Sequence, residues 1–330
     1  MTDGDFARDL VIDVGGTNAR FALAGRDADG RLTLSSVANK RVSLAPSFDS
    51  AVSEYLDEHC QGRAPARIGI GAAGPCRDGI CSITNAAWRI EAGALQPLCS
   101  TGLVVLANDL RAAARVVPDL SEEQGADFLT LRGTNAIANL RPDQEAACVV
   151  LNVGTGFGVA AVHRARAGGS YHWLTLGTEG GHVTNPGRAS GITDANSIEE
   201  IIAGRWLADY ASRRGGDGVS FEVAEDIFAA LDPGAGDEAR AAVARDVVKT
   251  VSWILGRATR DAILGYGAWD GVFFIGSVFE AWLPHADWAI FDEALGVGPF
   301  AEACGAVGLH VIRRPNAALY GAALLVEDAA

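Results

Sequence analysis

The chain has 330 residues, of which 49% are hydrophobic, and its formal net charge is -14 with a pI near 4.8. This length is about twice that of a typical domain, so we expect two domains. The acidic balance excludes a broad basic surface that would bind a phosphate backbone, and nucleic acid is therefore not an expected partner.

Neither a signal peptide nor a membrane segment is predicted. The N-terminal residues lack a basic region followed by a long apolar run, and no window reaches about 18 uninterrupted apolar residues. We therefore expect a cytoplasmic protein without a membrane partner. The cysteines are scattered, and the closest pair has no second pair to complete a zinc site. Free, mostly buried thiols are expected at Cys60, Cys76, Cys81, Cys99, Cys148 and Cys304.

Apolar runs bounded by glycine alternate with helical patterns along the chain, which predicts an α/β fold. In the first part, strands are predicted at 10–16, 19–25, 67–74 and 102–109, with a helix at 47–59. A second series has strands within 148–164 and at 271–278, and helices at 197–214, from 237 to about 264 and at 318–329.

The domain boundary is predicted near Pro118, within the run 111–124. The final helix is expected to return to the first half, which makes the first domain discontinuous. We therefore expect a small α/β domain at 1–118 plus 315–330 and a large α/β domain at 119–314.

The second series repeats the opening of the first. Residues 11–23 can be laid over 150–162 at an offset near 139, so that Asp13 falls on Asn152 and Gly15 on Gly154. An offset of this size indicates duplication of a domain rather than a solenoid. Chance similarity between two glycine-turn hairpins is the alternative.

Two turns have the composition of phosphate-binding loops. Gly15 and Gly16 allow backbone N–H groups to approach an anion, and Thr17 and Asn18 add side-chain donors. Asp13, at the end of the preceding strand, is a candidate for holding Mg²⁺ through water. A purely structural turn is the alternative. The second turn, which repeats the first, contributes Gly154, Thr155 and Gly156.

A carboxylate follows the strand at 102–109, where ligands usually lie in open α/β sheets. Asp109 is placed to accept a proton, and Asn108 to bind a neighbouring hydroxyl. The competing interpretation is that the pair caps the next helix, and the residues alone leave both open.

These segments together resemble the bacterial glucokinase family, in the order that the family has them. They are 10–23 (LVIDVGGTNARFAL), 83–88 (ITNAAW), 106–109 (LAND), 151–160 (LNVGTGFGVA), 176–183 (LGTEGGHV) and 197–202 (SIEEII). The resemblance spans roughly 10–325. It implies two ribonuclease-H-like domains of the actin-like ATPase kind, flanking a ligand cleft.

The resemblance also implies a function, the ATP-dependent phosphorylation of glucose to glucose 6-phosphate with Mg²⁺ in a homodimeric enzyme. Asp109 would be the catalytic base, with sugar contacts from Asn108, Glu179, His182 and Glu199. Gly276 and Ser277 would lie on the adenosine side. Kinases for mannose, fructose or N-acetylglucosamine, and an actin-like or Hsp70-like ATPase without a sugar site, are the alternatives.

Several of these residues also have structural interpretations. His182 can be a structural histidine, although the glycines around it favour an exposed loop. Ser197 and Glu200 have the spacing of a capping box, which would leave Glu199 free, and Glu199 itself can be a first-turn glutamate favoured by the helix dipole.

The chain departs from the family at residues 203–206 and at Ser277. Most members have a Ser-Gly-Pro-Gly-like run at the first place, where this chain has Ala203, Gly204, Arg205 and Trp206. Arg205 is either near ATP or a solvated helix residue, and the second is favoured. At the second place a serine replaces one of two paired glycines, which a tolerable φ angle allows.

Overall fold

A computed structural model describes residues 8–61, 63–83, 86–121, 127–189 and 193–330. Residues 84 and 85 of the run 83–88, and residues 122–124 of the predicted boundary run, lie outside the described residues. The chain divides into two compact units, Met1–Leu120 with Arg314–Ala330, and Ser121–Arg313. Within the described ranges, no helix is both long and apolar enough to cross a membrane.

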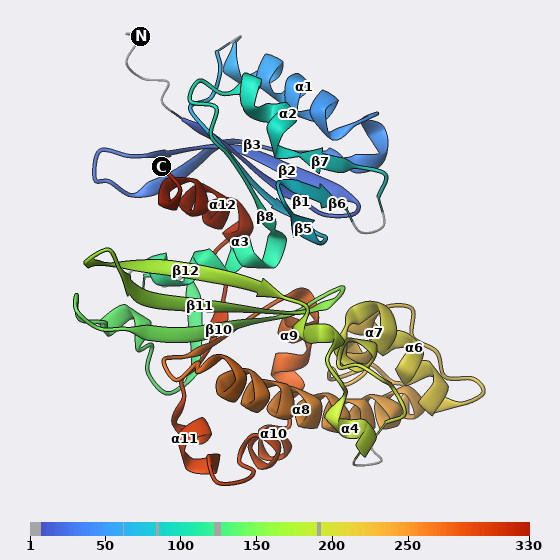
Figure 1. Ribbon diagram of the computed structural model, residues 1–330. Helices are drawn as coiled ribbons and strands as arrows, with labels where there is room; N and C mark the ends of the chain where they lie inside the picture. Colours follow the sequence, from blue (N-terminus) through green and yellow to red (C-terminus); the bar gives the residue numbers. More distant parts are fainter. Residues whose placement is uncertain (1–7, 62, 84–85, 122–126, 190–192) are drawn as a thin grey trace. The chain divides into compact units, whose positions relative to one another are not determined.

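The first unit is built on a five-stranded sheet of order β3-β2-β1-β4-β8 (Figure 1). Its strands are β1 (Asp9–Val14), β2 (Asn18–Arg26), β3 (Leu32–Arg41), β4 (Ile68–Ala72) and β8 (Val104–Asn108). β1 pairs antiparallel with β2 and parallel with β4, and β8 continues the parallel side. The predicted strands are all present.

Alternate side chains of β1 enter two different cores, as the strand period of two requires. Leu10 and Ile12 pack in one core with residues of α1 (Phe48–Cys60). Val11 packs on the opposite face with residues of α12 (Ala317–Asp328). Short elements complete the unit: β5 (Cys76–Arg77), β6 (Ile80–Ser82), β7 (Arg89–Glu91) and α2 (Ala92–Leu95).

The C-terminal helix α12 lies against α3 (Asp109–Arg115) at very short range. A Cβ atom added at Gly321 of α12 would lie 1.6 Å from the backbone oxygen of Ala112 in α3. Arg115 and Asp328 then form an ion pair at 2.6 Å between the same two helices. The last helix of the chain thus packs against the middle and the end of α3.

The second unit has a six-stranded sheet of order β12-β11-β10-β13-β14-β9. Its strands are β9 (Phe128–Arg132), β10 (Ala146–Val153), β11 (Phe157–Ala167), β12 (Ser170–Thr178), β13 (Val272–Ile275) and β14 (Leu309–Ile312). Its helices are α4 (Pro186–Ala189), α5 (Glu199–Ile202), α6 (Gly204–Gly215), α7 (Ala224–Ala229), α8 (Glu238–Tyr266), α9 (Ser277–Trp282), α10 (Trp288–Leu295) and α11 (Ala301–Ala306). The long α8 packs its buried side chains on β10 in one core.

The duplication predicted from the sequence is confirmed by the topology. The order β3-β2-β1-β4-β8 repeats as β12-β11-β10-β13-β14, with the same parallel and antiparallel pairings. The overlay was wrong by one residue after the turn. Val14 pairs with Ala19, but Val153 pairs with Phe157, because the second turn is one residue shorter.

The predicted helix at 197–214 is also wrong, because it is two helices. Ala203 has ψ 139 and separates α5 from α6. The break lets the N–H of Gly204 donate to the backbone oxygen of Gly154 at 2.8 Å instead of continuing α5.

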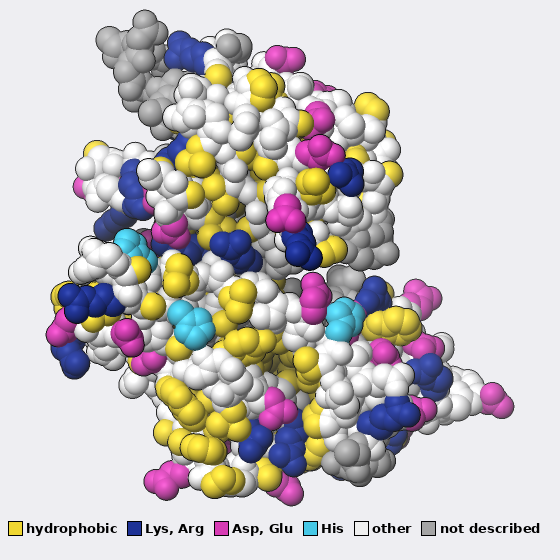
Figure 2. All heavy atoms as spheres, viewed as in Figure 1, with side chains coloured by type: hydrophobic (Ala, Val, Ile, Leu, Met, Phe, Trp, Pro, Cys, Tyr) yellow, Lys and Arg dark blue, Asp and Glu magenta, His cyan; other side chains and the backbone are white. Residues whose placement is uncertain are grey.

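The thiols agree with expectation. All six cysteines are free and five of them are buried. Acidic and basic side chains are interspersed on the face seen in Figure 2.

Candidate active site

The turn between β1 and β2 holds the first group of predicted residues. The N–H of Gly15 donates to the backbone oxygen of Asn18 at 2.9 Å, which closes the turn. Gly15 and Gly16 are half-buried, whereas Thr17 and Asn18 are exposed. The turn therefore presents backbone groups and two short polar side chains to solvent, a composition suited to an anion.

Asp13 lies one residue before the end of β1 with only 19% of its side chain exposed. Burial raises the pKa of its carboxyl to about 6, the ion pair with Arg20 at 3.3 Å lowers that pKa, and the charge of Asp109 raises it. Asp13 and Asp109 therefore lie close enough to interact within the first unit. A carboxylate disfavoured by burial and by a second carboxylate is suited to a divalent cation.

Asn108 and Asp109 stand where β8 ends and α3 begins. The Asn108 Oδ1 accepts from the N–H groups of Leu110 at 3.0 Å and Arg111 at 3.2 Å, so Asn108 is the cap of α3. Its Nδ2 donates to the backbone oxygen of Gly74 at 3.4 Å. Asp109 is the first helical residue, and its Oδ1 accepts from the Leu110 N–H at 2.8 Å.

These contacts support the capping interpretation for Asn108. Capping belongs to Asn108, whose side-chain oxygen satisfies two N–H groups of the helix end. The half-buried carboxylate of Asp109 lies at the same helix end, where the helix dipole favours a negative charge.

The turn between β10 and β11 holds the second predicted glycine group. The Gly154 N–H donates to the Gly156 backbone oxygen at 3.0 Å, and Thr155 is exposed at the tip. The Gly154 oxygen in turn accepts from the N–H of Gly204 at 2.8 Å. The start of α6 is thereby attached to this turn.

Gly276 lies against the end of β10 beside the same turn. Its φ is +119, and a Cβ there would lie 2.3 Å from the Val153 backbone oxygen and 2.6 Å from Asn152 Oδ1. Only glycine fits both restrictions. Ser277 is the first residue of α9 and has no unusual φ, which explains how a serine is accepted beside the glycine.

Asn152 was not among the predicted site residues, although its side chain lies beside Gly276. The signal was present in the sequence, because the repeat places Asn152 at the position of Asp13. Comparing the two repeats position by position would have identified Asn152 as a candidate.

A short 3₁₀ helix (Gly180–His182) follows β12, with Glu179 directly before it and His182 as its last residue. Both are exposed, and the His182 N–H donates to the Glu179 backbone oxygen at 3.0 Å. The glycines between them serve close packing as well as exposure. A Cβ at Gly181 would lie 1.9 Å from the Phe157 backbone oxygen, and one at Gly180 would lie 2.6 Å from Val159 Cγ2.

The sequence suggested that Glu199 is free. In the structure Glu199 is buried, and both of its carboxylate oxygens are bonded. Only 7% of the residue is exposed. Its Oε2 accepts from the Phe157 N–H at 3.1 Å, and its Oε1 pairs with the guanidinium of Arg205. Arg205 lies in α6 with 44% of its side chain exposed, as expected for a solvated helix residue, but its guanidinium is also paired with Glu199.

Glu200 does serve the start of its own helix, although one residue away from the predicted capping box. Its carboxylate accepts from the Asn196 N–H at 3.0 Å and from the Ser197 hydroxyl at 3.3 Å. α5 begins at Glu199, and no side chain caps it at Ile198.

Phe157 joins these predicted residues within the second unit. Its backbone oxygen contacts the glycine before His182, and its N–H binds Glu199. The same residue ends the turn 154–156. The predicted sugar-binding residues of this unit and its predicted phosphate turn are therefore neighbours.

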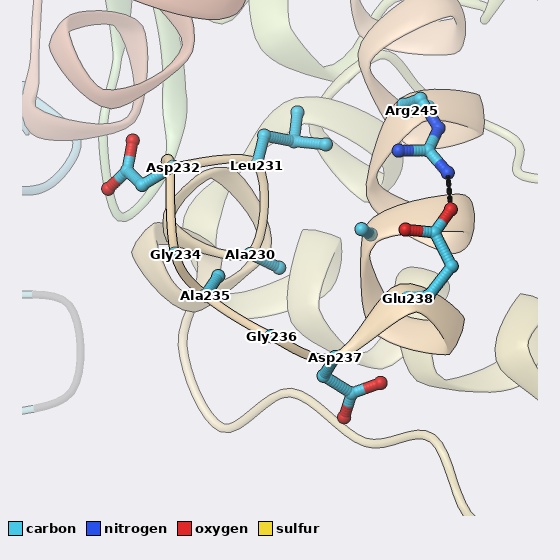
Figure 3. Close-up of a pocket in the computed structure, with 10 residues that line it drawn as sticks. Ala230, Leu231, Asp232, Gly234, Ala235, Gly236, Asp237, Glu238 and Arg245 are labelled. Atoms are coloured by element: carbon cyan, nitrogen blue, oxygen red, sulfur yellow. Dashed lines mark hydrogen bonds and ion pairs between the residues drawn. The ribbon is translucent and has the colours of Figure 1, made fainter.

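A separate hollow in the second unit contains none of the predicted residues. It has a volume of about 300 Å³ and is lined by the segment before α8 and the first turns of that helix (Figure 3). Arg245 and Glu238 form an ion pair at its wall. We assign no role in the reaction to this hollow.

Comparisons with known proteins agree with the resemblance. A family model described as glucokinase matches residues 10–329. A glucokinase of Stenotrophomonas maltophilia (strain K279a) is 30% identical over 331 residues, covering 97% of this chain and 95% of that protein.

Solved structures show the same fold. A glucokinase from an Antarctic psychrotroph has a TM-score of 0.76 at 24% identity, covering 98% of this chain and 100% of that one. A glucokinase from Balamuthia mandrillaris in complex with glucose has a TM-score of 0.74 at 18% identity, covering 99% and 95%. The two α/β units therefore have the fold that the resemblance implied.

Proposed function

The chain belongs to the glucokinase family, and we propose that it transfers the γ-phosphoryl group of ATP to the 6-hydroxyl of glucose, forming glucose 6-phosphate. The observation that carries the site assignment is that Asn108, and not Asp109, is the cap residue of α3. The helix end therefore does not depend on Asp109, whose Oδ1 shares the N–H of Leu110 with Asn108.

Asp109 is the proposed catalytic base. It accepts the proton of the sugar 6-hydroxyl as the hydroxyl oxygen attacks the γ-phosphorus of ATP and ADP leaves. A positioned base contributes on the order of 10² to 10⁴ in rate, while positioning and charge stabilisation supply the rest of the acceleration.

The proposed sugar contacts come from four side chains. Glu179 and His182 are exposed and offer an acceptor and a group that both donates and accepts. Glu199 is bonded to Phe157 and Arg205, so its remaining lone pairs have a set direction. Asn108 contributes through Nδ2, since its Oδ1 is used in capping.

The proposed nucleotide contacts are backbone groups. Gly15 and Gly16 with the side chains of Thr17 and Asn18 form one phosphate turn, and Gly154, Thr155 and Gly156 form the other. Gly276 and Ser277 lie on the adenosine side. Backbone N–H groups supply positive potential without net charge, which an acidic chain needs in order to bind a polyanion.

Mg²⁺ fits Asp13, whose carboxyl has a raised pKa and an acidic neighbour. When bound, the ion would neutralise charge on the phosphates. We also propose that the protein is cytoplasmic and forms a homodimer. Its two domains are proposed to have their boundaries at 118 and 315.

The test of the base is Asp109→Asn, with glucose KM, ATP KM and kcat measured by coupled ADP release. We expect kcat to fall by about 10² to 10⁴ while glucose binding, measured by calorimetry, changes little. Asp119→Asn, an exchange at another acid of the first unit that is paired with Arg314, is the control and should keep kcat. Turnover like that of the wild type in Asp109→Asn would end this assignment.

The sugar is tested with glucose, mannose, fructose and N-acetylglucosamine in the same assay. A kcat/KM highest for glucose supports the proposal. A higher value for another hexose would reassign the substrate within the same reaction class. ADP release that no sugar stimulates would overturn the kinase assignment and favour an ATPase without a sugar site.

A further inference from the structure

The contacts of Arg205 at the start of α6 give its side chain a definite orientation. Its guanidinium pairs with Glu199 Oε1, and its carbon Cζ lies 5.4 Å from the centre of the Trp206 ring. The side chain of Arg205 is 44% exposed, whereas that of Glu199 is 9% exposed. A carboxylate and an aromatic face therefore hold the guanidinium from two sides.

The pair is part of a closed series of contacts around the second glycine turn. Gly204, the residue before Arg205, donates its N–H to the Gly154 oxygen at 2.8 Å. Glu199 receives the N–H of Phe157, at the other end of the turn, at 3.1 Å. The Arg205–Glu199 pair closes this ring. The carboxylate therefore cannot rotate without breaking the hydrogen bond from Phe157 or the ion pair with Arg205.

The contacts also limit what Glu199 can bind. A carboxylate has about four acceptor sites, and Phe157 and Arg205 each occupy one. About two sites are left for sugar hydroxyls, in directions that the two bonds determine. Without Arg205, only the bond from the Phe157 N–H would hold the carboxylate, and the direction of its other oxygen would be less restricted.

We propose that Arg205 is a positioning residue that fixes the Glu199 carboxylate for hexose binding. This inference rests on the proposed function, because it takes Glu199 as a sugar contact. Arg205 acts through Glu199 and is not assigned a contact with the reacting atoms or with ATP.

Arg205→Gln removes the charge and keeps most of the side-chain length. We expect glucose KM to rise on the order of tenfold, a value reduced for the exposure of Arg205, while ATP KM at saturating glucose changes less than about twofold. Arg205→Lys should restore part of the glucose affinity, because it keeps the charge and loses the planar donor. The thermal midpoint serves as a check on folding.

The matched control is Arg213→Gln on the same helix. Arg213 forms an exposed pair with Asp209 at 2.8 Å and lies about 12 Å further along α6. Its removal should leave both KM values unchanged. A rise in glucose KM for Arg213→Gln equal to that for Arg205→Gln would mean that the effect comes from the helix and not from Glu199, and would overturn the inference.

A double-mutant cycle with Glu199→Gln separates this inference from the proposed function. If Arg205 acts through Glu199, the effect of Arg205→Gln on glucose KM should largely disappear in the Glu199→Gln background. Additive effects would refute the inference, as would an increase confined to ATP KM, which would place Arg205 at the nucleotide. If Glu199→Gln alone leaves glucose KM unchanged, the assignment of Glu199 in the proposed function fails instead.

Discussion

Replacing Asp13 by asparagine should stabilise the folded chain near neutral pH while it weakens catalysis. The pKa of the Asp13 carboxyl is raised from 3.8 to about 6, chiefly by burial. At about 1.4 kcal/mol per pH unit, keeping this group ionised costs the folded state about 3 kcal/mol at pH 8. This cost already includes the ion pair with Arg20, which lowers the pKa of Asp13.

The expected net gain of Asp13→Asn is therefore about 3 kcal/mol at pH 8, and its dependence on pH has a definite sign. Below pH 3.8 the carboxyl is protonated in both states and contributes nothing. Between pH 3.8 and about 6 the unfolded chain ionises first, so the wild type loses stability as the pH rises. Above about pH 6 the cost is constant.

The assay is urea unfolding of the wild type and Asp13→Asn from pH 4 to pH 8 in the presence of a chelator. Asp29→Asn, at a carboxylate in an exposed turn, is the control and should show no such gain. A difference that does not grow with pH, or a variant less stable than the wild type at pH 8, would refute the reasoning. Adding Mg²⁺ and ATP should reduce the advantage of the variant, because a bound cation favours the carboxylate.

Substitutions at three glycines yield further predictions. Gly321→Ala should lower the unfolding free energy by about 3 kcal/mol or more, because the new methyl group would lie 1.6 Å from the Ala112 oxygen. Gly305→Ala in α11 has nothing within 4 Å and should be neutral or stabilising by up to about 1 kcal/mol, so equal losses in a urea titration would contradict the packing argument. Gly276→Ala should raise ATP KM and lower the thermal midpoint, because φ is +119 and Val153 oxygen is 2.3 Å from the added carbon. Unchanged values of both would remove Gly276 from the nucleotide side.

The order of apolar runs and glycines in the sequence was enough to predict the α/β class, the positions of the main strands and the duplication. The fold class and the strands depend on periodicity within short windows of the sequence, and the duplication appears when two such windows are compared. The placement of Asn108 and Asp109 at a strand end also followed from local pattern, because the strand period stops where the helical pattern begins.

What only the tertiary structure decided concerns contacts between segments that are distant in sequence. The break at Ala203 depends on a bond from Gly204 to Gly154, and the partner of Glu199 depends on where α6 begins. The helix propensity of an arginine is the same whether its side chain lies in water or pairs with a carboxylate. The sequence pattern therefore could not distinguish a solvated Arg205 from a paired one. The same holds for Gly181, which looked like a loop residue and is a packing contact with Phe157.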